Sequence, residues 1–242
     1  MSRLLLLSSS RAGTTGYLDH AQPMIADFLE ADPTPVTRVL FIPFAGVGKT
    51  FDAYLEQVRP AFAAVGLTVD GIHQAADPIA AVREAQAIAV GGGNTFALVK
   101  RLYDTDLLDA IRERVEAGTP YIGWSAGSNI AGPTLCTTND MPIVEPPSFQ
   151  TLGLVPFQLN PHFISGKVAG HNGESREERL TEYLALNPQA WVVALREGTA
   201  LRCEGDSLRL IGELDGAIFT ADGERPIAAG SRVDALLEVE PA

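Results

Sequence analysis

The sequence predicts an α/β fold in which a mostly parallel sheet carries helices on both faces. Short apolar runs alternate with longer amphipathic stretches through the first two-thirds of the 242-residue chain. Strands that alternate with helices favour a parallel sheet, because each helix returns the chain to the same end of the sheet. After Leu201 the runs become short, and the dipeptides Gly205-Asp206, Asp215-Gly216 and Asp222-Gly223 separate them. Such dipeptides are typical of tight turns, so we expect C-terminal antiparallel hairpins.

The apolar runs give the expected elements in chain order. Strands are expected at 4–7, 39–42, 87–90, 121–123, 155–159 and 191–195. Helices are expected at 18–29, 51–65, 78–84, 95–103, 107–117 and 178–186. In the stretch 107–117, apolar residues recur at helical spacing. The chain has no long linker or internal repeat, and 46% of its residues are hydrophobic, enough for a sizeable core. We therefore expect a single domain over residues 1–242.

Charge and cysteine content limit the classes of function. Lys and Arg number 18 against 30 Asp and Glu, a net charge of −12 that argues against a nucleic acid or an anionic membrane as partner. Cys136 and Cys203 lie far apart without metal-ligand spacing, which favours a reducing compartment. The apolar run at 4–7 is too short for a signal peptide, and no stretch approaches transmembrane length. We expect a soluble, cytoplasmic protein.

The stretch Gly123-Trp124-Ser125-Ala126-Gly127 predicts a reactive serine. It follows a short strand and leads into a helical stretch, so Ser125 is expected on the sharp turn called a nucleophile elbow. Glycines relieve crowding in such a turn, and the serine backbone is strained. The Oγ atom would then stand over a helix N-terminus, whose free N–H groups can stabilise an oxyanion.

A nucleophilic serine needs a base, and the chain has four histidines, His20, His73, His162 and His171. His162 follows the strand expected at 155–159, and open α/β sheets have their sites at the carboxyl ends of strands. His162 is therefore the preferred candidate. His171, in a Gly-rich polar loop, is a weaker one. His20 is expected to be structural or solvated, and His73 receives little weight.

Two acids could orient the base. Glu197 follows the strand expected at 191–195, and Asp140 lies in the irregular segment 137–142 after the elbow. The chain order of a catalytic triad varies between folds, so the residues alone leave this choice open.

Two glycine-containing stretches look like nucleotide-binding loops but lack required residues. Gly91-Gly92-Gly93-Asn94-Thr95 would need a further glycine where Phe96 stands, and Gly48-Lys49-Thr50 would need a glycine in place of Pro43. The first stretch suits an oxyanion hole, because small residues let backbone N–H groups approach a carbonyl. In the second, Thr50 suits a helix N-cap. We therefore expect no cofactor and, without metal-ligand spacing, no metal.

Six stretches in order together resemble the peptidase E family of α-aspartyl dipeptidases. They are Phe41-Ile42-Pro43-Phe44-Ala45-Gly46, Val90-Gly91-Gly92-Gly93-Asn94-Thr95-Phe96, Tyr121-Ile122-Gly123-Trp124-Ser125-Ala126-Gly127, Thr137-Thr138-Asn139-Asp140-Met141-Pro142-Ile143-Val144, Asn160-Pro161-His162-Phe163 and Gly173-Glu174-Ser175-Arg176-Glu177. The resemblance extends from near the N-terminus to about Gly198 and becomes loose beyond Leu201. It implies a cytoplasmic serine peptidase that releases N-terminal aspartate from Asp-X dipeptides, on a fold like that of class I glutamine amidotransferases.

The resemblance also implies roles for individual residues. Ser125 would be the nucleophile and His162 the general base. Glu197 matches a glutamate that orients the histidine, and Asp140 matches a further acid of the site. The motifs place the backbone N–H groups of Gly93 and Ala126 in the oxyanion hole.

Two further residues are expected to bind substrate. Arg176 matches an arginine implicated in aspartate recognition, and Asn94 is a second candidate substrate-binding residue. The expected partners are small Asp-X peptides, and a homodimer is a candidate assembly. No cofactor is implied.

Two alternatives stay open. A cyanophycinase-like peptidase would trim β-linked aspartyl–arginine polymers, but the chain shows no insertion that would build a longer, more open site. A non-catalytic binding protein with an amidotransferase-like fold would normally lack the nucleophile or the base, and both are present here.

Overall fold

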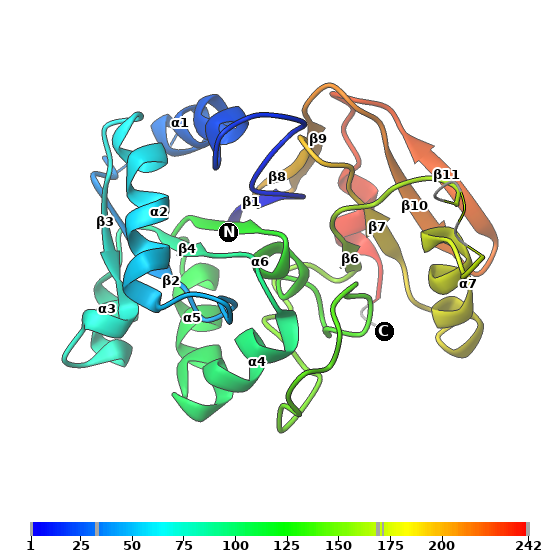
Figure 1. Cartoon of the computed structure of the whole chain (residues 1–242). Coiled ribbons are helices and arrows are strands. Elements are labelled where there is room, and N and C mark those ends of the chain that lie inside the picture. Colours follow the sequence, from blue (N-terminus) through cyan, green and yellow to red (C-terminus); the bar gives the residue numbers. More distant parts are fainter. Residues whose placement is uncertain (1, 32–33, 168–169, 171, 241–242) are drawn as a thin grey trace.

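The computed structural model describes residues 2–31, 34–167, 170 and 172–240, which form two sheets and the helices around them (Figure 1). The larger sheet has seven strands, in the spatial order β3 (Thr68–Gly71), β2 (Arg38–Ile42), β4 (Ile88–Val90), β5 (Tyr121–Trp124), β1 (Arg3–Leu7), β8 (Ala200–Glu204) and β9 (Ser207–Ile211). The smaller sheet has four, in the order β11 (Gly223–Ile227), β10 (Gly216–Thr220), β7 (Val192–Ala194) and β6 (Gln158–Asn160).

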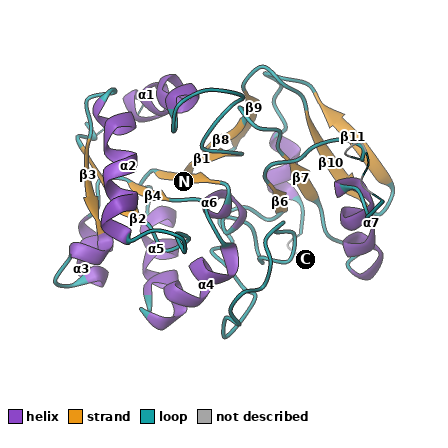
Figure 2. Ribbon diagram, in the orientation of Figure 1, coloured by secondary structure: helices purple, strands orange, loops and turns teal. Residues whose placement is uncertain are grey.

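The helices connect and cover these strands, as Figure 2 shows by colour. They are α1 (Gln22–Glu30), α2 (Phe51–Ala63), α3 (Pro78–Glu84), α4 (Thr95–Asp104), α5 (Leu107–Glu116), α6 (Ala126–Asn129) and α7 (Arg176–Leu186). Three short 3-10 helices are η1 (Asp19–Ala21), η2 (Ile72–Gln74) and η3 (Asp234–Glu238).

Strand directions confirm the predicted fold class. Strands β1 to β5 pair in parallel, whereas β8 and β9 add to β1 as an antiparallel hairpin. In the smaller sheet, β6 and β7 are parallel, and the hairpin of β10 and β11 is antiparallel. The sheet is mostly parallel, and the C-terminal hairpins are present. The hairpin of β8 and β9 belongs to the larger sheet, and that of β10 and β11 belongs to the smaller one.

The larger sheet is buried on both faces, which explains why its strands are continuous apolar runs. Alternate residues of β1 point to opposite sides, since side chains alternate along a strand. Leu4 and Leu6 join the core formed with α3, α4 and α5, and Leu5 and Leu7 join the core formed with α1 and α2. Helices therefore lie on both faces, as Figure 1 shows.

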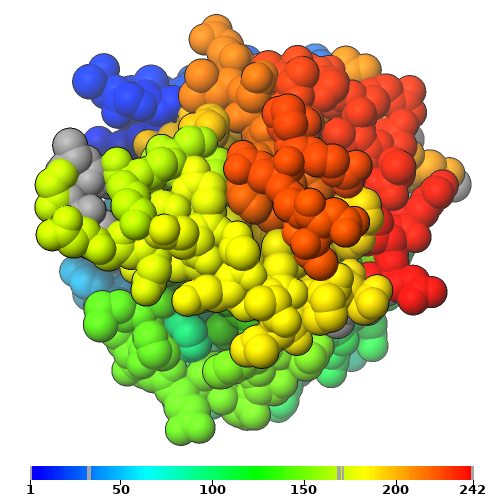
Figure 3. Space-filling view, turned by 90° about the vertical axis from the view of Figure 1, so that its right-hand side faces the viewer, coloured from blue at the N-terminus to red at the C-terminus, as the bar shows by residue number. Residues whose placement is uncertain are grey.

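Helix α7 covers the smaller sheet. Its Leu180 and Leu184 pack with Phe163, Val192 and Phe219 in a separate apolar cluster. Figure 3 shows this side of the molecule, where the yellow segment that contains α7 lies beside the orange C-terminal strands. The segment that contains β6 and β7 thus has its own core, next to the larger sheet.

Some expected boundaries differ from the structure. The helix expected at 18–29 begins as a 3-10 turn, and α1 starts at Gln22 with Pro23 in its first turn, where proline is favoured. The strand expected at 155–159 is reduced to β6, because Val155 N–H bonds to Ala131 O instead of a neighbouring strand. Helix α7 starts at Arg176 because Ser175 and Glu178 form a capping box. The predicted N-cap Thr50 is confirmed.

Neither a membrane helix nor a metal cluster is found within the described ranges. No helix there is long and apolar enough to cross a membrane. No group of three or more His, Cys, Asp or Glu side chains there could hold a metal ion.

The close packing of α6 on β4 gives a stability prediction. A Cβ atom added at Gly127 would lie 2.1 Å from Val90 O, a backbone atom that cannot move aside cheaply. We expect Gly127→Ala to lower stability by about 1–3 kcal/mol and Tm by roughly 2–12 °C. Thermal unfolding followed by circular dichroism measures this. Gly48→Ala is the control, because no heavy atom lies within 4 Å of its added Cβ. Equal Tm values for the two variants would contradict the prediction.

Candidate active site

Ser125 lies on the sharp turn between β5 and α6, as the elbow motif predicts. Its backbone has φ 54° and ψ −113°, a conformation that is strained for any residue except glycine. The turn is tight enough that a Cβ at Gly123 would come within 2.5 Å of Gly127 O. Ser125 N–H donates to Leu7 O at 3.1 Å, which ties the turn to the neighbouring strand β1. The serine is thus held at the carboxyl end of the larger sheet.

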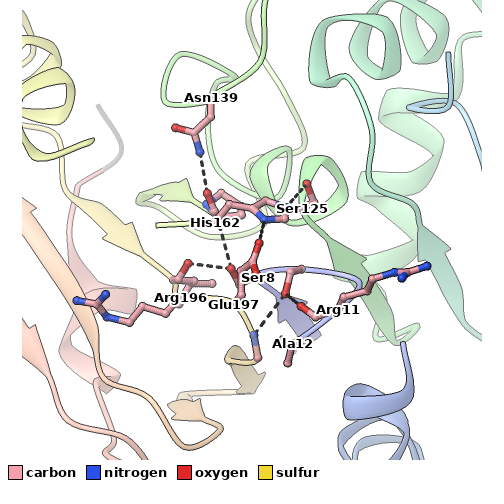
Figure 4. Close-up of polar contacts among 12 residues, drawn as sticks. Ser8, Arg11, Ala12, Ser125, Asn139, His162, Arg196 and Glu197 are labelled. Carbon is pink, nitrogen blue, oxygen red and sulfur yellow. Dashed lines mark hydrogen bonds and ion pairs between the residues drawn. The ribbon is translucent and has the colours of Figure 1, made fainter. Parts of the chain in front are cut away.

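His162 connects Ser125 to Glu197 (Figure 4). Its Nε2 lies 3.0 Å from Ser125 Oγ, and its Nδ1 lies 2.7 Å from Glu197 Oε1. A carboxylate can only accept, so Nδ1–H donates to Glu197 and Nε2 is left to accept the hydroxyl proton of Ser125. The side chains of His162 and Glu197 are 39% and 51% exposed. Such an exposed pair adds little stability, so its main effect is to orient the ring.

Ser8 positions the backbone of His162, and sequence reasoning did not single it out. His162 N–H donates to Ser8 Oγ at 2.9 Å, and the Ser8 hydroxyl donates to Leu195 O at 2.8 Å. Ser8 directly follows β1, so its position at a strand end could have indicated it. His162 has φ 57°, a second strained residue of the site. The Ser8 bonds favour this conformation.

Asp140 contacts neither Ser125 nor His162 by a hydrogen bond, and Glu197 contacts the histidine instead. Asp140 Oδ2 accepts bonds from Thr95 N and Thr95 Oγ1, both at 2.7 Å, and from Thr138 Oγ1 at 3.2 Å. The other oxygen, Oδ1, accepts no bond from a described residue. Asp140 lines a narrow pocket together with Ser125 and His162. The carboxylate is therefore held rigidly while one oxygen stays available.

Arg176 reaches the site through Asn139. Its guanidinium donates to Asn139 Oδ1 at 2.6 Å, and Asn139 lines the same narrow pocket. Asn139 Nδ2 in turn donates to Pro161 O at 2.7 Å, next to His162. Burial, followed by repulsion from Arg179, lowers the pKa of Arg176, while Asp140 raises it. The predicted arginine thus lies one side chain away from the pocket.

A larger cavity opens on the other side of the serine. Its volume is about 430 Å³, against about 20 Å³ for the narrow pocket, and Ser125 and His162 line both. Lys49, Tyr17 and Tyr54 contribute to its wall. Ser125 therefore separates a narrow, acidic side from a wider side that carries a lysine.

The glycine stretch after β4 lies against the serine. A Cβ at Gly92 would come 2.9 Å from Ser125 Cβ, and one at Gly93 would come 2.2 Å from Ala45 O. Gly93 has φ 137°, which other residues avoid. Among the described residues, neither the N–H of Gly93 nor that of Ala126 has a hydrogen-bond acceptor. Both can therefore donate to a bound group.

The remaining candidates lie elsewhere or serve other contacts. Asn94 caps α4 through its Oδ1 and donates from Nδ2 to Met141 O, although it also lines the larger cavity. His73 bonds to Asp52 Oδ1 at 3.0 Å. Both ring nitrogens of His20 are buried without a partner among the described residues, and burial lowers its pKa. His171 lies outside the described residues.

Comparisons with known proteins agree on one family. Residues 4–211 match the model of peptidase family S51. The chain is 51% identical to peptidase E of Shewanella amazonensis over 236 residues, which cover 97% of this chain and 99% of that protein. It is 52% identical to peptidase E of Haemophilus influenzae over 212 residues, covering 88% and 96%. The crystal structure of a peptidase from an acI-B1 actinobacterium shares the fold, with a TM-score of 0.71, 19% identity and 96% of each chain covered.

The different contacts of the two acids predict different kinetic defects. Glu197→Gln should lower kcat by about 100-fold or more with little change in KM, because a neutral amide does not stabilise the imidazolium. Asp140→Asn keeps the side-chain shape but loses its charge, so KM should rise by about tenfold or more if Oδ1 binds a cationic substrate group. Steady-state kinetics on a peptide substrate measures both variants. A higher KM in Glu197→Gln together with a lower kcat at unchanged KM in Asp140→Asn would exchange the two assignments.

Proposed function

Because the chain belongs to peptidase family S51, we propose that it is a serine dipeptidase that hydrolyses Asp-X dipeptides and releases their N-terminal aspartate. The observation that carries this proposal is the alignment of Ser125 Oγ, the His162 ring and the Glu197 carboxylate. A catalytic triad is recognised by such geometry. In this proposal the enzyme is a single domain that acts in the cytoplasm. Cys136 and Cys203 form no disulfide, which fits a reducing compartment.

The reaction is an acyl transfer. His162 Nε2 takes the proton of Ser125 as Oγ attacks the carbonyl carbon that follows the aspartyl residue. The N–H groups of Gly93 and Ala126 stabilise the oxyanion. The protonated His162 then gives its proton to the leaving amine. Water attacks the aspartyl ester with His162 as base and restores the serine.

The polar groups of the narrow side match an N-terminal aspartyl residue, and its volume of about 20 Å³ must widen for that residue to enter. Asp140 Oδ1 is available to accept from the substrate's α-ammonium group, which would explain a requirement for a free N-terminus. Arg176 offers planar donors that match a carboxylate. Its bond to Asn139 Oδ1 uses one of them. In this proposal the aspartyl carboxylate takes the position of Asn139 Oδ1, so Asn139 moves aside when substrate binds.

The wider cavity suits the leaving residue. Its volume of about 430 Å³ accommodates side chains of different sizes. The Lys49 ammonium lies on its wall, 4.7 Å from the centre of the Tyr54 ring. A cation there suits the free carboxylate of the second residue of a dipeptide.

The first test is removal of the nucleophile. Ser125→Ala should reduce turnover of Asp-X dipeptides by at least about 1,000-fold while the protein stays folded, because a triad acts as a unit. Release of aspartate from a panel of Asp-X, β-aspartyl-arginine, Glu-X and Asn-X dipeptides is measured. Ser207→Ala, in β9, is the control and should behave as wild type. A wild-type preference for β-aspartyl-arginine would favour a cyanophycinase-like activity, and no hydrolysis at all would favour a binding protein.

The second test concerns the choice of aspartate. Arg176→Ala should reduce kcat/KM for Asp-X by about thirtyfold or more, because an unpaired carboxylate in a buried site costs about 2–5 kcal/mol. The preference for Asp-X over Asn-X should shrink by a similar factor. Arg179→Ala is the matched control, since this arginine lies one turn along α7 and pairs with Glu174 at 3.7 Å. Unchanged discrimination in Arg176→Ala would show that another residue reads the side chain.

A further inference from the structure

A chain of hydrogen bonds connects the nucleophile's strand to the glycine stretch opposite it. Trp124 Nε1 donates to Tyr17 Oη at 2.8 Å, and Trp124 is the residue before Ser125. Tyr17 Oη lies 2.8 Å from Tyr54 Oη, and Tyr54 Oη donates to Gly92 O at 2.9 Å. The three side chains come from β5, from the loop before η1 and from α2. We call these residues, Trp124, Tyr17 and Tyr54, the aromatic relay.

The direction of every bond in the aromatic relay is determined. An indole N–H can only donate, and a carbonyl oxygen can only accept. The proton of Tyr54 is used on Gly92 O, so Tyr17 must donate to Tyr54. Burial raises the pKa of both phenols, that of Tyr54 well above its ordinary value, so both remain protonated donors over the working pH range.

The end of the aromatic relay holds one particular peptide group. Gly92 C=O and Gly93 N–H belong to the same planar peptide and point in opposite directions. A bond that holds Gly92 O on the Tyr54 side therefore directs Gly93 N–H the other way. The neighbours leave this peptide little freedom, since a Cβ at Gly91 would lie 2.6 Å from Tyr54 Oη and one at Gly92 would lie 2.9 Å from Ser125 Cβ.

We propose that Tyr54, supported by Tyr17 and Trp124, is a positioning residue that aims the Gly93 N–H at the oxyanion of the tetrahedral intermediate. This proposal rests on the acyl-transfer mechanism above. Pre-orientation matters because a donor that must rotate into place during the reaction stabilises the developing charge less. Glycines at 91–93 permit the close approach, and the hydroxyl of Tyr54 fixes the direction of the peptide group between Gly92 and Gly93.

The hydroxyl groups can be tested separately from the rings. The Trp124 and Phe41 rings stack at 5.7 Å, and the Tyr54 ring packs edge-on against Phe41 at 5.0 Å. Tyr17 packs edge-on against both Tyr54 and Trp124. Phenylalanine at position 17 or 54 keeps these contacts and removes only the hydrogen bonds.

The experiment measures kcat, KM and the binding of two ligands for Tyr54→Phe and Tyr17→Phe. The substrate is whichever dipeptide of the panel the wild type hydrolyses fastest. The ligands are free L-aspartate and an aspartyl aldehyde. Ser125 Oγ adds to the aldehyde carbon, its proton passes to His162, and the full charge of the resulting oxyanion lies at the Gly93 donor. The α-carboxylate of aspartate shares its charge between two oxygens and depends far less on that donor.

Tyr54→Phe should lower kcat and the affinity for the aldehyde by the same factor, about tenfold to 100-fold, with KM and aspartate affinity changed by less than about twofold. Tyr17→Phe should act in the same direction but less, since Tyr54 can still donate to Gly92. Tyr103→Phe is the matched control, because its hydroxyl donates to Gln150 O at 3.1 Å and it lines neither cavity of the site.

Two results would overturn the positioning role. One is a Tyr54→Phe enzyme with unchanged kcat and aldehyde affinity. The other is a parallel loss of kcat, aspartate affinity and Tm in both variants, which a general structural defect would give. A wild type that prefers a dipeptide other than Asp-X would overturn the proposed substrate while the aromatic relay is still tested on the preferred one, with the matching amino acid and aldehyde as ligands.

Discussion

The site depends on the hydroxyl of Ser8, which joins the two sheets. Ser125 belongs to the larger sheet, whereas His162 and Glu197 follow strands of the smaller one. Ser8 accepts from His162 N–H and donates to Leu195 O, so it holds both second-sheet strand ends against the end of β1. Ser125 N–H donates to the carbonyl oxygen of Leu7, the residue before Ser8, so Ser125 and His162 are both held at the end of β1. With both residues attached there, His162 Nε2 lies 3.0 Å from Ser125 Oγ.

Two of the four non-glycine residues with positive φ in the described part of the chain lie in the candidate site. Ser125 and His162 both have positive φ, and each such residue costs on the order of 1–3 kcal/mol. The surrounding bonds and close contacts offset this cost. They also explain the glycines at 92 and 127, where side chains would collide with Ser125 Cβ and Val90 O. The geometry is thus maintained by the packed sheet and does not depend on the local sequence preferring it.

Much of this arrangement could be predicted because it follows from local patterns. The strand-to-helix turn at Ser125 and the parallel sheet are visible in glycine spacing and apolar periodicity. The sequence could not divide the strands between two sheets, because apolar runs do not specify their pairing partners. The choice between Glu197 and Asp140 depends on which loop meets the His162 ring, a tertiary contact. Tyr17 and Tyr54 were missed for the same reason, since their hydroxyl contacts with Trp124 and Gly92 form only in the folded chain.

The unequal spaces on the two sides of Ser125 have a consequence for the order of events. In the proposed mechanism the amine leaves through the wider cavity, while the acyl group stays on the narrow side with its ester carbonyl facing the emptied space. Water must enter from there, so the first product departs before the second half-reaction begins. A free amino acid that occupies the same space can attack in place of water and rebuild a dipeptide. The direction of net reaction then depends on competition between water and amines for that cavity.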